Sequence, residues 1–450
     1  MMSIRGEETG VKTLASKSRK RYGGIVAMAV PLLLAGCAGN FNRDTGPEVV
    51  TVSNLAGSSF GGRQPIAGAS IYLYAAGVTG YASSATNVLT TPVTSTAAGT
   101  FYIASFSCTA GQQMYIVSIG GNPGAGTNAN AGIMAALGDC ANLGQYSFIN
   151  INEMTTVGTA FALSPFSSGY ATVGTSSTNT AGLARAFASV NKLVNVASGQ
   201  PYGSALPAGA TKPTSEIISL ANVLAACVNS TGGASGDGSI CGKLFGYATP
   251  SGGSAPTDTI AATMAIAQSP TLNVTSIFNL AATIPPYAGG LTVAPNDWTM
   301  PIVYAPSGLS TPNAPVIDSS GKVWVANAGN NTVTVLAQTG APVSGSPFTG
   351  NGLNGPAAIA IDASGNAWVA NKGGTTVSAF TSSGGVFSGS PFTGSGNLSA
   401  PASLAFDAAG YLWVANSTGN SVTELNSAGS FVTQVTTGVT APGAIVIDPK

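Results

Sequence analysis

The stretch VIDSSGKVWVAN at residues 316–327 recurs as AIDASGNAWVAN at 360–371 and as AFDAAGYLWVAN at 405–416. A fourth copy begins at Val446-Ile447-Asp448. The tryptophans of the full copies are 44 and 45 residues apart: Trp324, Trp368 and Trp413. A repeat of this length is typical of one four-stranded unit in a radial array of sheets, so these copies decide the fold of the last third of the chain.

Each copy has the same internal parts. One strand ends at an Asp that can bond the backbone of a turn closed by Gly, and the strand W-V-A-N then returns. A third strand such as Thr332–Leu336 follows, and a fourth is expected in residues 345–349 and 389–393. Residues 296–450 are therefore predicted to form a partial β-propeller of three units plus an opening strand.

The repeated acids are Asp318, Asp362 and Asp407. They could form a ring around a central channel that binds a cation, but their identical place in each copy favours a turn-forming role. The repeated tryptophans Trp324, Trp368 and Trp413 are expected in the core of the units, although aromatic rims can also contact glycans or peptides. We predict no metal site and no cofactor.

On these motifs, residues 296–450 resemble NHL and streptogramin-lyase-like propellers. Streptogramin lyases depend on a catalytic His and a divalent metal, and this chain contains no His. Gluconolactonase-type propellers use a Ca²⁺ bound by carboxylates, but beyond Glu424 this segment lacks the extra, non-repeated acids for such a site. The resemblance therefore implies the fold and argues against the lyase activity; no catalytic residue is predicted.

The number of units leaves two alternatives. A closed propeller typically needs at least four blades. Either the chain continues beyond Lys450, or the units form an arc that another surface completes. The residues Asp448-Pro449-Lys450 look like the start of another turn, which favours the first alternative.

The N-terminus has the layout of an export signal. A basic segment precedes an apolar run from Ile25 to Ala35, which is too short to span a bilayer. Leu34-Ala35-Gly36-Cys37 resembles the lipobox of bacterial lipoproteins; the alternative is an ordinary signal peptide with a chance Cys. We predict a signal peptide over residues 1–36, lipidation at Cys37, and membrane attachment through the lipid, in the outer membrane if the organism is Gram-negative, since Ala38 follows the Cys.

The other four cysteines fall into two local pairs, Cys108 with Cys140 and Cys227 with Cys241. An oxidising compartment permits two disulfides with these partners. Three pairings of four cysteines exist, so the choice rests on proximity. Free thiols or a metal site are the alternatives, and the spacing and the missing His disfavour a metal.

Three more segments precede the repeats. Residues 37–62 are rich in Gly, Ser and Thr and are predicted to be a flexible tether. Residues 63–146 alternate as short strands and resemble carboxypeptidase-regulatory-like, or prealbumin-like, β-sandwiches through Pro65–Ala69 and Ala98–Phe101. Residues 147–295 are predicted to be a helical domain. Its expected helices contain Leu183, Phe187, Val190 and Val194; Ile217, Leu220, Leu224 and Cys227; residues 258–267; and residues 274–282.

Composition limits the function. Without His there is no Ser-His-Asp or Cys-His pair, so catalysis would rest on carboxylates, Lys, Tyr or an oxygen-ligated metal. Charged residues are 7% of the chain and form no basic cluster, which argues against nucleic acid. The sequence predicts a multidomain, mainly β envelope lipoprotein with a helical middle, acting as a non-catalytic binding or scaffolding protein for an unknown protein or glycan. The alternatives are a propeller hydrolase or lyase for a small cyclic or sugar-derived substrate, and a component of a cell-envelope layer.

Overall fold

The computed structural model describes residues 46, 48–201, 206–207 and 209–448. The predicted signal peptide, residues 1–36, and the predicted lipid site Cys37 lie outside the described residues. Within the described part, no helix is long and apolar enough to cross a membrane.

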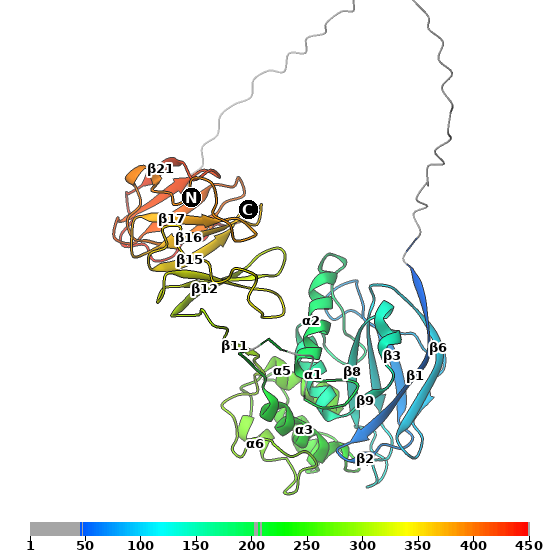
Figure 1. The fold of residues 1–450 in the computed structure, drawn as a ribbon. Helices are drawn as coiled ribbons and strands as arrows, with labels where there is room; N and C mark the ends of the chain where they lie inside the picture. The colour runs from blue at the N-terminus through cyan, green and yellow to red at the C-terminus, as the bar shows by residue number, and fades with distance from the viewer. Residues whose placement is uncertain (1–45, 47, 202–205, 208, 449–450) are drawn as a thin grey trace, which may run out of the picture. The chain divides into compact units, whose positions relative to one another are not determined.

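The first half of the described chain contains two sheets packed face to face (Figure 1). In the first, β1 (Val49–Gly61) pairs with β2 (Gln64–Pro65) and β6 (Thr100–Thr109), and runs parallel to β9 (Ile149–Ile151). The second sheet has the order β4-β3-β7-β8, with β5 also on β3. Its strands are β3 (Ser70–Ala75), β4 (Thr86–Asn87), β5 (Val93–Thr94), β7 (Gln113–Ile119) and β8 (Gly132–Asp139).

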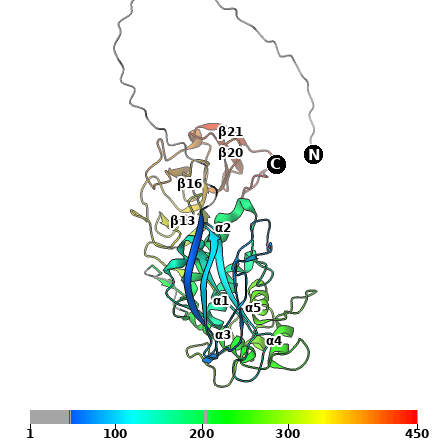
Figure 2. The same ribbon diagram turned by 90° about the vertical axis from the view of Figure 1, so that its right-hand side faces the viewer.

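The second sheet is buried on both faces. Along β7, Met114 and Ile116 pack between the two sheets, whereas Tyr115 and Val117 pack against helices. The helices are α1 (Glu153–Leu163), α2 (Thr180–Leu193), α3 (Thr214–Val228), α4 (Ile240–Tyr247), α5 (Thr259–Gln268) and α6 (Val274–Phe278). Short 3-10 turns are η1 (Cys140–Gln145), η2 (Ser164–Phe166), η3 (Ser177–Asn179) and η4 (Gly394–Gly396). The result is three layers, two sheets and a layer of helices (Figures 1 and 2).

This arrangement corrects the predicted boundary at residues 146/147. The apolar cluster on the helical side contains Tyr115 and Met134 from strands together with Phe187 and Leu224 from helices. The predicted sandwich and the predicted helical domain therefore share one core, because the alternating strands bury both of their faces.

The predicted tether over residues 37–62 is also wrong for its second half. Residues 49–61 form β1, the long dark-blue strand of Figure 2. Its Gly and Ser residues serve packing: a Cβ at Gly57 would collide with the ring of Phe101 and with the carbonyl oxygen of Ile149. Small residues here mark the close approach of neighbours rather than flexibility.

The predicted helices are present, with two changes of length. The first is in α2, which ends at Leu193, so Val194 lies just beyond it. Leu183, Phe187 and Val190 line the buried face of α2, and Asp258 caps α5 by accepting a hydrogen bond from Ala261 N at 2.8 Å. The helix expected over residues 274–282 ends at Phe278. Two helices, α1 and α4, were not predicted.

The repeats form three consecutive antiparallel sheets within the described residues. Their strands are β12 (Pro312–Ile317), β13 (Val323–Asn327) and β14 (Thr332–Leu336); β15 (Pro356–Ile361), β16 (Ala367–Asn371) and β17 (Thr376–Phe380); and β18 (Pro401–Phe406), β19 (Leu412–Asn416), β20 (Ser421–Leu425) and β21 (Phe431–Val435). The expected fourth strands at 345–349 and 389–393 are reduced to single bridges, Val333 with Phe348 and Val377 with Phe392. The opening strand of the fourth copy, expected at Val446-Ile447-Asp448, is not formed, because residues 442–448 have no strand structure. Ahead of the repeats, β11 (Val303–Tyr304) pairs with β10 (Ala210–Thr211).

Candidate functional site

The repeated acids bind groups of their own unit. Asp318 accepts hydrogen bonds from Ser320 N at 2.9 Å and Lys322 N at 3.0 Å through Oδ1, and from the Trp324 indole N–H at 3.0 Å through Oδ2. Asp362 and Asp407 bond the equivalent turn N–H groups, and they accept from Trp368 at 3.1 Å and from Trp413 at 3.0 Å. Each carboxylate therefore joins a turn to the tryptophan of the next strand.

In two of the units these contacts favour the charged form of the acid, at Asp318 and at Asp407. Burial of Asp318 opposes its charge, but the hydrogen bonds from Ser320 and Trp324 prevail and lower its pKa. The indole of Trp413 lowers the pKa of Asp407. Among the described residues, no three His, Cys, Asp or Glu side chains gather as a metal ion would require.

Two of the repeated tryptophans, Trp324 and Trp368, lie where consecutive sheets meet. Trp324 and Trp368 are fully buried, and Trp413 is half-buried. Trp368 stacks on Phe392 of its own unit at 5.0 Å and meets Phe406 of the next unit edge-on at 5.9 Å. These rings hold neighbouring sheets together.

A third repeated residue, the Asn that ends W-V-A-N, has a role that the sequence analysis missed. Asn371 is fully buried and donates to Thr376 Oγ1 at 3.0 Å and Ser378 Oγ at 2.8 Å. Its Oδ1 accepts from Asn354 N at 3.1 Å. Asn327 and Asn416 make the equivalent bonds. The recurrence of Asn beside polar Thr or Ser at fixed spacing was the available signal.

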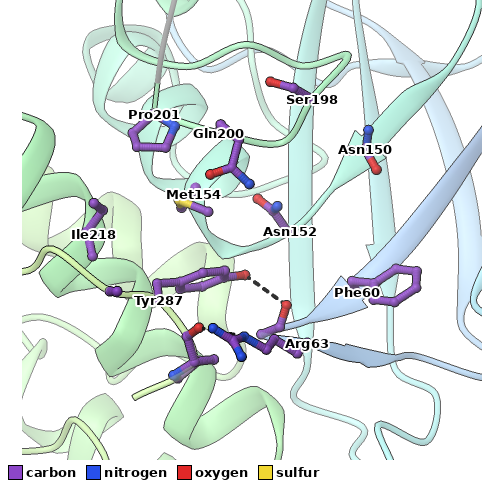
Figure 3. Close-up of a pocket in the computed structure, with 13 residues that line it drawn as sticks. Phe60, Arg63, Asn150, Asn152, Met154, Ser198, Gln200, Pro201, Ile218 and Tyr287 are labelled. Atoms are coloured by element: carbon purple, nitrogen blue, oxygen red, sulfur yellow. Dashed lines mark hydrogen bonds between the residues drawn. The ribbon is translucent and has the colours of Figure 1, made fainter. Parts of the chain in front are cut away.

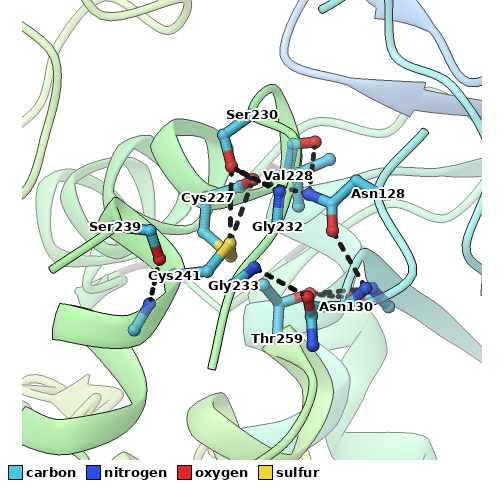
Figure 4. Close-up of a disulfide and its surroundings, with 12 residues drawn as sticks. Asn128, Asn130, Cys227, Val228, Ser230, Gly232, Gly233, Ser239, Cys241 and Thr259 are labelled. Atoms are coloured by element: carbon cyan, nitrogen blue, oxygen red, sulfur yellow. Dashed lines mark hydrogen bonds between the residues drawn. A yellow bond between two sulfur atoms is a disulfide. The ribbon is translucent and has the colours of Figure 1, made fainter. Parts of the chain in front are cut away.

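Both disulfides are present with the pairing expected from the sequence, Cys108–Cys140 and Cys227–Cys241. Beside the second, Asn128 donates to the carbonyls of Cys227 at 2.8 Å and Val228 at 3.1 Å (Figure 4). Asn130 accepts from Gly233 N at 2.9 Å. The loop before β8 thus caps the end of α3.

A cavity of about 470 Å³ lies beside α1 (Figure 3). Its lining residues come from the β1–β2 turn, from β9, from the loop after α2, from α3 and from the segment after α6. Those that carry the argument below are Phe60, Arg63, Ser198, Gln200 and Tyr287.

Glu153, the first residue of α1, is fully buried next to this cavity. Gly62 N donates to both of its oxygens, at 3.0 and 2.9 Å, and the Tyr287 hydroxyl donates at 2.6 Å. Burial raises the pKa of Glu153 to about 7, and these hydrogen bonds counteract only part of that effect. A buried acid with a pKa near neutrality is a feature typical of functional sites.

Two further contacts fix the segment that carries Tyr287. Asn222 on α3 donates to the Tyr287 carbonyl at 2.9 Å and accepts from the Tyr287 N–H at 3.0 Å. Arg63 Nε donates to the Pro286 carbonyl at 3.0 Å. Hydrogen bonds therefore connect the segment that carries Tyr287, which forms one wall of the cavity, to the β1–β2 turn and to α3.

The chain matches no protein-family profile and no curated protein sequence. Parts of it resemble solved structures. A streptogramin B lyase is 17% identical over 31% of this chain and 46% of the lyase, with a TM-score of 0.28. Virginiamycin B lyase from Staphylococcus aureus is 16% identical over 29% of this chain and 42% of that protein (TM-score 0.26). A protein of unknown function from Bacteroides caccae is 21% identical over 30% and 49%, respectively (TM-score 0.25). This chain thus spans less than half the length of each of the three.

Proposed function

We propose that this chain is a lipoprotein of the cell envelope, attached to a membrane through Cys37, that acts as a non-catalytic binding or scaffolding protein. One observation carries the non-catalytic role: the recurring Asp and Asn side chains are engaged inside their own units. Asp362 bonds Trp368, and Asn371 bonds Thr376 and Ser378, so the repeats use these groups to build sheets.

The low share of charged residues agrees with a binding or scaffolding role. Charged residues are only 7% of the chain, so an envelope protein or glycan would meet mainly hydroxyl, amide and backbone groups on the repeats. Such a surface suits recognition by many neutral hydrogen bonds. In the repeats, no contact of the recurring Asp and Asn side chains favours the hydrolase or lyase alternative.

The experiment is detergent partition of the full chain produced in a bacterial host fed a labelled fatty acid. The wild-type protein is expected to carry the label and to enter the detergent phase, because several acyl chains anchor a protein durably. Cys37→Ser is expected to lose the label and stay in the aqueous phase. Cys108→Ser is the matched control, and it should keep the label. An unlabelled wild-type protein in the aqueous phase would contradict the anchor.

A further inference from the structure

We propose that the cavity beside Arg63 is a binding site for a small acidic sugar, and that the Arg63 guanidinium holds its carboxylate. The inference rests on the proposed binding role and names a ligand class for it.

Charge is the first argument. Arg63 is the one charged side chain among the residues that line this cavity, and it has no ion-pair partner in the described part of the chain. Its Nε bonds the Pro286 carbonyl at 3.0 Å, which fixes the plane of the guanidinium. The two terminal amino groups remain for a ligand. A planar guanidinium with two parallel N–H groups matches the two oxygens of a carboxylate.

The turn that carries Arg63 is the second argument. Gly62 has a φ of +61°, and a Cβ there would meet two Pro286 atoms at 2.9 Å. Only glycine therefore lets the turn lie this close to the segment that carries Tyr287. Both oxygens of the buried Glu153 accept from Gly62 N, so a carboxyl group held in the interior fixes the backbone next to Arg63.

A neutral side chain would hold this turn without the cost of a buried acid. The buried Glu153 therefore holds the backbone directly before Arg63, whose own side chain is exposed to a ligand. Burial raises the pKa of Glu153 to about 7, so the carboxyl is partly protonated at neutral pH and only partly offsets the Arg63 charge.

The remaining lining favours a sugar over a simple acid. Phe60 is half-buried at the cavity wall, and Tyr287 adds a second ring (Figure 3). The Gln200 amide is exposed and makes no hydrogen bond with described residues, and Ser198 contributes a hydroxyl. Rings pack against the C–H face of a sugar, while amide and hydroxyl groups bond its hydroxyls. The volume of about 470 Å³ is in the range of small-ligand sites.

The test is calorimetric titration of the purified full chain with glucuronate, with glucose and acetate as comparison probes. We expect glucuronate to bind at least tenfold more tightly than either probe. Arg63→Gln should weaken glucuronate binding at least tenfold, and Arg63→Lys, which keeps the charge but loses the planar fork, should weaken it less. Arg185→Gln, an exposed arginine of α2, is the matched control and should leave the affinity unchanged.

Three results would overturn the proposal: no glucuronate binding to the wild-type chain, unchanged binding to Arg63→Gln, or acetate binding as tightly as glucuronate. Thermal unfolding of each variant establishes that it is folded before titration. The outcome is separate from that of the anchor, because detergent partition depends on Cys37 and not on this cavity.

Discussion

The hydroxyl of Tyr287 donates a hydrogen bond to Glu153 at 2.6 Å and thereby joins residues 134 positions apart. Gly62, which is 91 positions from Glu153, donates to the same carboxylate. Burial is the main cause that raises the pKa of both partners, and the negative charge of Glu153 raises that of Tyr287 further. Three distant segments therefore meet at one proton-binding group.

Replacement of Glu153 should change how stability depends on pH. The pKa of Glu153 is about 7 in the folded chain against an ordinary value of 4.5, so the folded state binds this proton more tightly than the unfolded state. The contribution of Glu153 is most favourable below pH 4.5, falls as the pH rises to about 7, and is constant above that. The loss is about 3 kcal/mol at most.

Urea unfolding from pH 4.5 to pH 8 measures this effect as the difference between the wild-type protein and Glu153→Gln. For Glu153→Gln, the free energy of unfolding should lack the decrease with rising pH that Glu153 causes in the wild-type protein. Glu216→Gln, which changes a half-buried acid in the first turn of α3, is the control and should retain it. Equal slopes for the wild type and Glu153→Gln would contradict the assignment.

Asp362→Ala should destabilise the repeats by about 2 to 3 kcal/mol, because it leaves the buried indole N–H of Trp368 without its acceptor and frees a turn. Urea unfolding followed by tryptophan fluorescence measures the change. Lys372→Ala alters an exposed side chain one residue after the W-V-A-N strand and should change the free energy of unfolding by less than about 0.5 kcal/mol. A similar small effect from Asp362→Ala would mean that the Asp–Trp bond contributes little.

Gly57→Ala should cost about 1 to 3 kcal/mol, since its Cβ would collide with the Phe101 ring and the Ile149 carbonyl oxygen in the sandwich. Thermal unfolding is a sufficient measurement. Gly144→Ala is the comparison, because nothing lies within 4 Å of a Cβ at that position. If the two variants melt alike, β1 is packed less closely than described.

Removal of each disulfide should destabilise the chain according to the loop it closes. The Cys227–Cys241 link has a sequence separation of 14, and its replacement by two serines should cost about 3 kcal/mol. The Cys108–Cys140 link has a separation of 32 and should cost about 4 kcal/mol. Urea unfolding of each double-serine variant measures the two values separately, and a reductant that leaves the wild-type midpoint unchanged would argue against these bonds.

The repeats were predictable because each copy makes the same short-range contacts with the same residues. The hydrogen bond from Trp324 to Asp318, six positions away, is an example. The helix α2 was predictable because it has one apolar face. In contrast, α1 buries Glu153, Thr155, Thr156 and Thr159 along with its apolar residues, so no polar face reveals its period. The cavity was missed because its residues come from segments far apart in the sequence. Glu153 was not distinguishable from a surface acid until its partners were known.

The two-sided burial of β7 has a consequence for the alignment of its strand. The Tyr115 ring packs among the helices, and its hydroxyl donates to the Tyr170 carbonyl at 2.7 Å. A shift of one residue would turn this hydroxyl into the apolar space between the sheets, where Met114 and Ile116 now lie. Tyr115 is therefore compatible with only one register of β7 in its sheet.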